Sequence, residues 1–168
     1  MSTKRVVATT LTDLHKEPSF LTELLTQVTN GAELEVLKTD GEWCHVRQLD
    51  GYEGWAYRAY LADASEAVTT THLVCDAALG LFASKECSGV PVTRLPIGMA
   101  VRVEEQAGDR ARIKLAGNLI PTGWAMTRSP FASRMTAWKL IFCGGWAHEY
   151  NVMTKYVKTI NALFIIAW

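Results

Sequence analysis

The fold of this chain is indicated first by one short stretch, Asp50-Gly51-Tyr52-Glu53-Gly54-Trp55. Asp-Gly is a strong β-hairpin signal, because both central residues of a type I′ turn need a positive φ. The second glycine lets the backbone approach a bulky group closely, and the neighbouring tryptophan supplies one. Another Gly-Trp pair follows at Gly123-Trp124. This recurrence predicts two copies of one small β module.

The sequence also repeats itself around these pairs. Leu14 aligns with Leu81 and Val46 with Ile113, at one offset of 67 residues (81 − 14 and 113 − 46). The same offset joins Leu25 to Val92, Val28 to Leu95, Gly31 to Gly98, Leu34 to Val101, Val36 to Val103 and Gly41 to Gly108. Apolar residues fall on apolar residues and glycines on glycines without a gap. The pattern favours internal duplication over a chance similarity of two β-rich stretches.

Each copy consists of short alternating strands joined by glycine turns, which is typical of a small, strongly bent barrel. The sequence therefore predicts a mostly β chain with two small barrels in tandem. The predicted domains are a first barrel at 1–64, a linker at 65–71, a second barrel at 72–129 and an atypical tail at 130–168. In the tail, apolar residues recur at helical spacing from Tyr150 to Phe164, so an amphipathic helix is one expectation. The other is a broken or truncated reading frame.

Composition excludes several classes of function. The formal net charge is 0, so the chain has no electrostatic footprint for nucleic acid or an anionic membrane. No signal peptide or membrane span is visible, and we expect a cytoplasmic protein. The four cysteines are irregularly spaced, which favours free thiols over disulfides. His72 and Cys75 have half of a metal-site spacing without a second pair, so we expect no metal and no cofactor.

Four segments in order resemble bacterial SH3-like domains. They are Leu14-His15-Lys16-Glu17-Pro18-Ser19, Asn30-Gly31-Ala32-Glu33-Leu34-Glu35-Val36, Gly41-Glu42-Trp43 and Asp50-Gly51-Tyr52-Glu53-Gly54-Trp55. The tandem pair, over residues 6–128, is similar to the N-terminal half of NlpC-type cysteine peptidases. These are γ-D-glutamyl-L-diamino-acid endopeptidases of cell-wall recycling. The resemblance implies SH3-like barrels that precede a papain-like catalytic domain.

In that family a Glu and a Tyr of the first barrel help to hold the free amino end of the murein peptide. Carried over by motif, these residues are Glu17 and Tyr52. A carboxylate can bind an ammonium through a charge-assisted hydrogen bond, and a tyrosine adds a directed hydroxyl and a ring wall. The alternatives are a solvated loop carboxylate for Glu17 and a turn aromatic packed on Trp43 or Trp55 for Tyr52.

Further ligand contacts are expected from a shallow aromatic groove of Trp43, Trp55 and Tyr57 together with Tyr52. For Trp55 the alternative is a place in the core. The second copy keeps the apolar skeleton but carries Ser84 where the first has Glu17. It also carries Arg110 where the first has Trp43, which predicts a structural or docking role for the second barrel.

A catalytic nucleophile is not expected in this chain. Glu86-Cys87-Ser88-Gly89 superficially resembles the family's Asp-Cys-Ser-Gly, but no helix signal follows Cys87. Cys143 lacks the neighbouring Asp and Ser, and His148 is the only histidine downstream of Cys87. An enzyme that uses Cys87 and His148 is the weakest of three hypotheses.

The first hypothesis is the non-catalytic recognition part of an NlpC-type cell-wall peptidase, which binds or gates the free amino end of murein peptides. Its partners are murein peptide and a peptidase catalytic domain. The second is a free-standing SH3-like module that binds cell-wall peptide or a protein partner. Neither hypothesis involves nucleic acid or a membrane.

Overall fold

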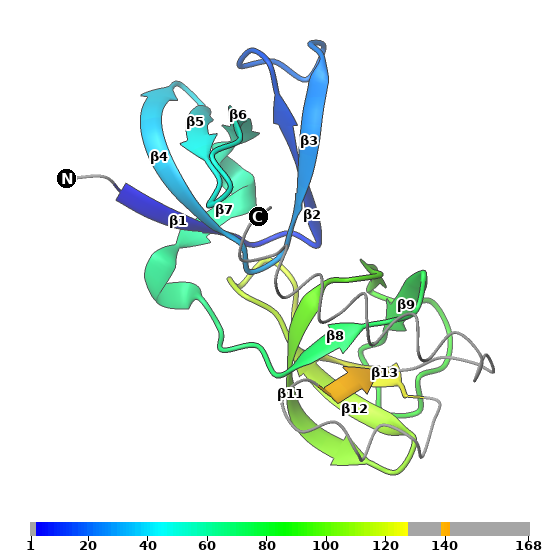
Figure 1. Cartoon of the computed structure of the whole chain (residues 1–168). Coiled ribbons are helices and arrows are strands. Elements are labelled where there is room, and N and C mark those ends of the chain that lie inside the picture. The colour runs from blue at the N-terminus through cyan, green and yellow to red at the C-terminus, as the bar shows by residue number, and fades with distance from the viewer. Residues whose placement is uncertain (1–2, 128–138, 142–168) are drawn as a thin grey trace, which may run out of the picture.

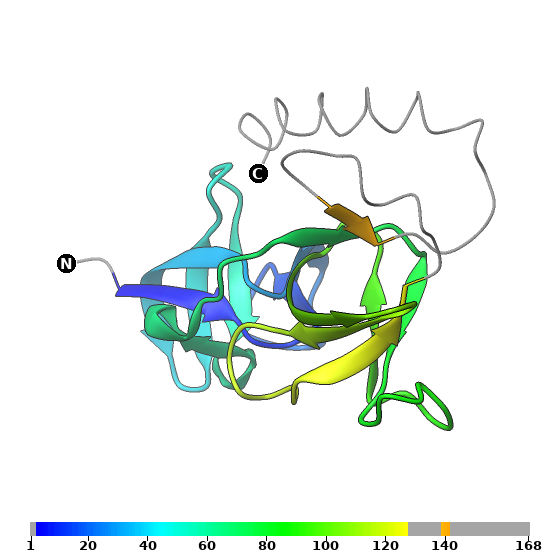
Figure 2. The same ribbon diagram turned by 90° about the horizontal axis from the view of Figure 1, so that it is seen from below.

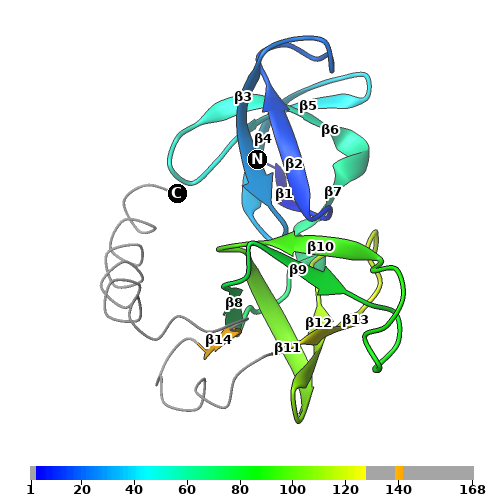
Figure 3. The same ribbon diagram turned by 90° about the vertical axis from the view of Figure 1, so that its right-hand side faces the viewer.

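The structure is a computed structural model that describes residues 3–127 and 139–141. Two β lobes lie one above the other in Figures 1 and 3, the blue-to-cyan lobe above the green-to-yellow lobe. We call them the first barrel (residues 3–63) and the second barrel (residues 72–126). The mostly β fold with two barrels in tandem is therefore confirmed. Among the described residues, no helix is long and apolar enough to cross a membrane.

The first barrel is one seven-stranded antiparallel sheet with the order β3-β2-β6-β5-β4-β1-β7. Its strands are β1 (Thr3–Val7), β2 (Leu11–His15), β3 (Leu24–Thr29), β4 (Glu33–Asp40), β5 (Trp43–Arg47), β6 (Glu53–Tyr57) and β7 (Leu61–Asp63). A 3-10 helix, η1 (Arg58–Tyr60), joins β6 to β7. The strands curl around one core, as Figure 2 shows from below.

Side-chain alternation builds that core. Along β5 the buried residues are Cys44 and Val46, and along β6 they are Gly54 and Ala56. The core is completed by Val7, Leu14, Val28, Leu34 and Leu61. Gly54 is needed where it stands, because a Cβ there would lie 2.9 Å from the Cβ of Leu14. The close approach that the first Gly-Trp pair predicted is therefore present, between β6 and β2.

The second barrel repeats this order of strands. Its strands are β8 (His72–Val74), β9 (Ala78–Leu81), β10 (Thr93–Pro96), β11 (Ala100–Ala107), β12 (Arg110–Lys114) and β13 (Gly123–Met126), and β14 (Lys139–Ile141) pairs with β8. The larger sheet has the order β13-β12-β11-β8-β14, and a bridge from Phe82 to Trp124 connects it to the β10-β9 hairpin. Because each strand takes the place of its counterpart, the predicted duplication is confirmed in the fold.

The two copies also agree in detail. Strand β11 has the bounds of β4 shifted by 67 at both ends (100 − 33 and 107 − 40). The β4–β5 ladder has a bulge between Val36 and Lys38, and the β11–β12 ladder has one between Val103 and Glu105, again 67 residues later. A bulge fixes the local twist and register of a strand pair. Both barrels are therefore bent at the same place.

The barrels join through the loop between β12 and β13, where the second copy has two extra residues. The Asn30 side chain is 4% exposed, and its Nδ2–H donates to the Ala116 carbonyl oxygen at 3.1 Å. In return the Ala116 N–H donates to the Asn30 Oδ1 at 2.8 Å. Gly117 has a φ of 71°, and a Cβ there would lie 2.6 Å from the Cβ of Ala8. The lengthened loop therefore docks the second barrel against the first.

The connection and the tail complete the described chain. A 3-10 helix, η2 (Ala64–Glu66), follows β7, and the Glu66 carbonyl accepts the Gly117 N–H at 3.2 Å. Strand β14 runs parallel to β8, whereas β7 runs antiparallel to β1 at the equivalent edge of the first barrel. The amphipathic helix expected at 150–164 lies outside the described residues.

Candidate functional site

The outer face of the β5–β6 hairpin carries the aromatic residues that the sequence singled out. Alternation directs Cys44, Val46, Gly54 and Ala56 into the core, so the residues between them face outward. The strand register pairs these outward residues in three rungs: Trp43 with Tyr57, His45 with Trp55, and Arg47 with Glu53. The alternative of a core position for Trp55 is therefore not observed, because its strand neighbours Gly54 and Ala56 occupy the core positions.

One end of the hairpin forms an aromatic cluster of His15, Phe20, Trp43, Tyr57 and Tyr60. Phe20, from the β2–β3 loop, lies 4.7 Å from the ring of Trp43 and 5.2 Å from that of Tyr57, measured between centroids. Trp43 and Tyr57 lie 5.6 Å apart, and Tyr60 follows at 5.2 Å from Tyr57. These are the separations of attractive ring pairs. Phe20 is nevertheless 55% exposed, so the aromatic cluster presents apolar surface to solvent.

His15 lies at the buried base of the aromatic cluster. It is 6% exposed and meets Phe20 and Trp43 edge to face, at centroid distances of 5.9 and 5.7 Å. Its Nδ1 lies 3.4 Å from the backbone oxygen of Thr22. Its Nε2 is buried and has no hydrogen-bond partner among the described residues. Buried polar atoms are paired in the great majority of cases, so this nitrogen stands out.

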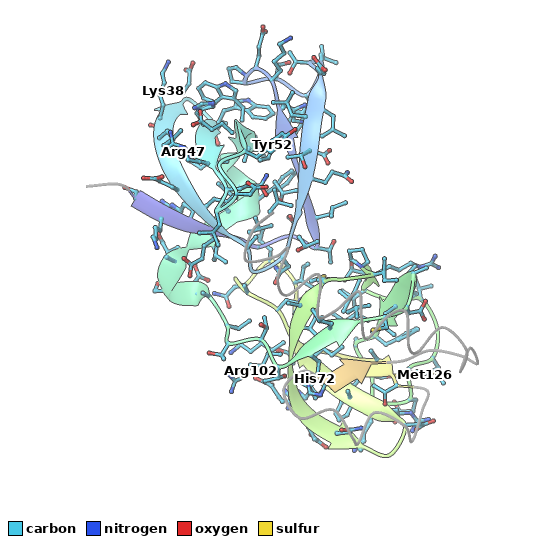
Figure 4. All side chains as sticks on the ribbon, in the orientation of Figure 1. Lys38, Arg47, Tyr52, His72, Arg102 and Met126 are labelled. Atoms are coloured by element: carbon cyan, nitrogen blue, oxygen red, sulfur yellow. The ribbon has the colours of Figure 1, made fainter. Side chains whose placement is uncertain are left out.

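The middle and far rungs of the hairpin are more polar. The rings of His45 and Trp55 lie 5.1 Å apart, and the Lys38 ammonium lies 5.8 Å above the Trp55 ring. At the far rung the Arg47 guanidinium forms a 2.7 Å ion pair with Glu53, and this bond is the first cause of a raised Arg47 pKa. Figure 4 shows Lys38 and Arg47 on this part of the first barrel. The outer face therefore grades from aromatic to charged.

Glu17 and Tyr52 lie in different loops of the first barrel. Glu17 is exposed on the β2–β3 loop that also carries Phe20, and its carboxylate makes no hydrogen bond or ion pair with a described residue. Tyr52 is 57% exposed and precedes β6, and the Asp50 carboxylate accepts its N–H at 2.9 Å. Strand β2 runs antiparallel to β6 with His15 opposite Trp55, so the chain leaves β2 in the direction of Glu53. A joint role of the two side chains in binding stays a prediction.

The second barrel lacks this aromatic cluster. At the 67-residue offset, His15 corresponds to Phe82 and Phe20 to Cys87, while Trp43 corresponds to Arg110. Its outward Trp124 is covered instead by the Lys85 ammonium, 4.8 Å from the ring, and Lys85 also pairs with Glu105 at 3.5 Å. The loss of aromatic residues from a face whose fold is unchanged distinguishes the first barrel as the candidate binding element.

Cys87 does not have the environment of an activated nucleophile. It is buried in the β9–β10 loop with a φ of 51°. Burial raises the pKa of its thiol, the nearby Arg110 guanidinium partly opposes this, and Asp109 and Glu86 raise it further. A reactive cysteine needs a lowered pKa. Its suggested partner His148 lies outside the described residues. Residues 3–127 hold no cluster of three or more His, Cys, Asp or Glu that could bind a metal.

Sequence reasoning did not single out His15 and Phe20 as site residues. His15 was named only as part of the first SH3-like segment, Leu14 to Ser19. The alignment of the two copies contained a signal for both residues. At the shared offset His15 aligns with Phe82, and Phe20 aligns with Cys87. Polar and aromatic differences between copies mark positions that the common core does not require.

A small curled sheet with an outward aromatic cluster at a loop end is characteristic of SH3-like barrels, a class of binding domain. The family model described as "Bacterial SH3 domain" matches residues 9–62. These residues therefore form a bacterial SH3 domain, and the predicted resemblance is confirmed for them. No curated protein matches the sequence.

The chain resembles solved structures of NlpC-type proteins to different degrees. An NlpC/P60 family protein from Bacillus cereus ATCC 10987 has 15% sequence identity and a TM-score of 0.57 over 73% of this chain and 54% of that chain. NlpC2 from Trichomonas vaginalis has 14% identity and a TM-score of 0.34, over 75% of this chain and 46% of that chain. The chain thus spans about half the length of these proteins. The Bacillus cereus match establishes a shared fold, whereas the second is too weak to support any inference.

Proposed function

We propose that the first barrel binds the free amino end of murein peptides. In this proposal the chain is the non-catalytic recognition part of an NlpC-type cell-wall peptidase. The observation that carries the proposal is the aromatic cluster, which the first barrel has and the second barrel lacks. Two copies with one fold and different outer faces imply that the difference serves binding and not folding.

The chemistry of the outer face suits a short peptide with a free amine. Aromatic faces attract cations, and Trp43 and Tyr57 provide such faces. Glu17 adds an unpaired carboxylate on the β2–β3 loop. A peptide that reaches from these rings to Tyr52 has to extend along the hairpin past Trp55, over the roughly 13 Å that four strand residues span. We therefore place the amine at the aromatic cluster and the remainder of the peptide towards Tyr52.

In this proposal catalysis belongs to a separate Cys–His domain, and the second barrel holds the first in place for it. The similarity of fold to an NlpC/P60 family protein, 54% of which is covered by the match, supports this division of roles. The docking of the β12–β13 loop on the first barrel also supports it, because a fixed angle between barrels would present the outer face to one side.

Titration of the full chain with murein tripeptide, followed by tryptophan fluorescence, tests the proposal. We expect saturable quenching or enhancement from Trp43. The Trp43→Arg variant lacks this fluorophore, so its binding is measured by calorimetry and should be abolished. The Trp124→Ala variant in the second barrel is the matched control and should leave binding unchanged. Tighter binding after a separate NlpC-type catalytic domain is added would support the proposal that the chain is the recognition part of such a peptidase. Binding that the added domain does not change would favour the free-standing module, and no binding in either case would refute both.

A further inference from the structure

The unpaired nitrogen of His15 carries an inference that rests on the proposed function and deepens it. A backbone carbonyl can only accept a hydrogen bond, so the contact of Nδ1 with the Thr22 oxygen requires that Nδ1 carry the proton. In the neutral imidazole Nε2 is then an acceptor with a free lone pair. A buried acceptor without a donor is destabilising. With the imidazole neutral, the group that completes this site must therefore donate a hydrogen bond.

The surroundings of Nε2 narrow the class of donor. Phe20 and Trp43 lie within 5.9 Å of the imidazole centroid, and both are aromatic rings that favour a positive charge near their faces. Glu17, two residues after His15, adds an unpaired carboxylate on the same loop. An ammonium group satisfies all three features, because it donates hydrogen bonds and carries the charge.

We propose that His15 is the specificity-determining residue that receives the ammonium group of the bound peptide through Nε2. In this arrangement Glu17 supplies the counter-charge from the loop, and the aromatic cluster provides the walls. A peptide whose amine is acylated loses both the charge and two of its donors. His15 therefore distinguishes free from blocked amino ends.

A ligand can reach Nε2 only if one neighbouring ring moves. Trp43 is held in a strand rung opposite Tyr57, whereas Phe20 is 55% exposed on the β2–β3 loop. Exposed side chains change rotamer within picoseconds to nanoseconds. Phe20 is therefore the ring that moves aside and then covers the bound amine.

The second barrel supplies the design of the test. In the second barrel Phe82 occupies the position equivalent to His15, so the shared fold accepts a phenylalanine at this position. His15→Phe should therefore fold, and its midpoint of urea denaturation should equal or exceed that of the wild type, since a buried unpaired acceptor is removed. If His15 served only the stability of the fold, His15→Phe would instead lower the midpoint of urea denaturation. His15→Gln, which restores a carbonyl acceptor, is the second variant.

The measurement is the affinity of the full chain for murein tripeptide and for its N-acetylated form. Wild type should prefer the free amine by roughly 10- to 100-fold, the ratio expected for one charge-assisted hydrogen bond. His15→Phe should lower that ratio to near one, and His15→Gln should keep part of it. An unchanged ratio in His15→Phe would overturn this inference but leave the proposed function standing. A wild type that binds neither peptide, with or without an added NlpC-type catalytic domain, would overturn both.

Discussion

The side chain of Asn30 should determine whether the two barrels unfold together. Both of its hydrogen bonds go to the backbone of Ala116, and all of these groups are buried. Asn30→Ala leaves one N–H and one carbonyl without partners, at about 1 to 3 kcal/mol each. We therefore expect the free energy of unfolding to fall by about 2 to 6 kcal/mol. That is a large part of the roughly 5 to 15 kcal/mol that stabilises a typical domain.

The substitution should act on the junction and not on the first barrel itself. The turn around Asn30 is held by backbone hydrogen bonds from the N–H of Asn30 to the Thr10 oxygen, and from the N–H of Gly31 to the Val7 oxygen. Neither bond involves the Asn30 side chain. Loss of the amide should therefore uncouple the barrels, and one transition in urea should split into two.

Hydrogen exchange at a single amide is the sharpest assay of this prediction. The Ala116 N–H should be protected in the wild type and exchange much faster in Asn30→Ala. Asn118→Ala is the control, because Asn118 lies at the same junction but donates to Glu66 in an exposed pair, which we expect to contribute less than about 1 kcal/mol. An Asn30→Ala variant within about 1 kcal/mol of wild type, with Ala116 still protected, would refute the argument.

Three further outcomes are expected. Gly117→Ala should destabilise the chain by more than the roughly 1 kcal/mol that its positive φ alone costs, because the new Cβ would meet the Cβ of Ala8 at 2.6 Å. Thermal denaturation measures this loss. The matched comparison is Gly41→Ala, since Gly41 has a φ of 54° and open space around it. Burial raises the pKa of Cys87, so its alkylation at neutral pH should be slower in the folded chain than in urea, by mass spectrometry. Trp43→Arg, the residue type of the second copy, should abolish peptide binding and leave the far-UV circular dichroism unchanged.

Much of the fold could be predicted from the sequence, because glycine turns and alternating apolar residues leave a small barrel few alternatives. The offset between Leu14 and Leu81 correctly gave two copies of one fold. The same alternation along the strand predicts that Trp55 faces outward, because Gly54 and Ala56 occupy the inward positions. The alternative of a core position for Trp55 rested on the general tendency of tryptophan to be buried, and that tendency was misleading here.

The site was harder to predict, because contacts across loops are not encoded by spacing along the chain. Trp43 and Tyr57 meet because β5 and β6 pair, which the Asp50-Gly51 turn predicted. Phe20 joins them only because its loop folds back over the hairpin, and no local pattern indicates such a fold. Motif order likewise gave no sign of where Glu17 and Tyr52 would lie relative to the aromatic cluster. Their roles in binding stay predictions for the titration.

The way in which Asn30 holds the second barrel has an evolutionary consequence. Its partner is main chain, so no residue type at position 116 other than proline, which lacks the N–H, can supply or withdraw the bonds. Co-variation between positions 30 and 116 should therefore be weak, even though they are in contact. A genetic screen for suppressors of Asn30→Ala should find none at position 116, and revertants should restore the asparagine itself.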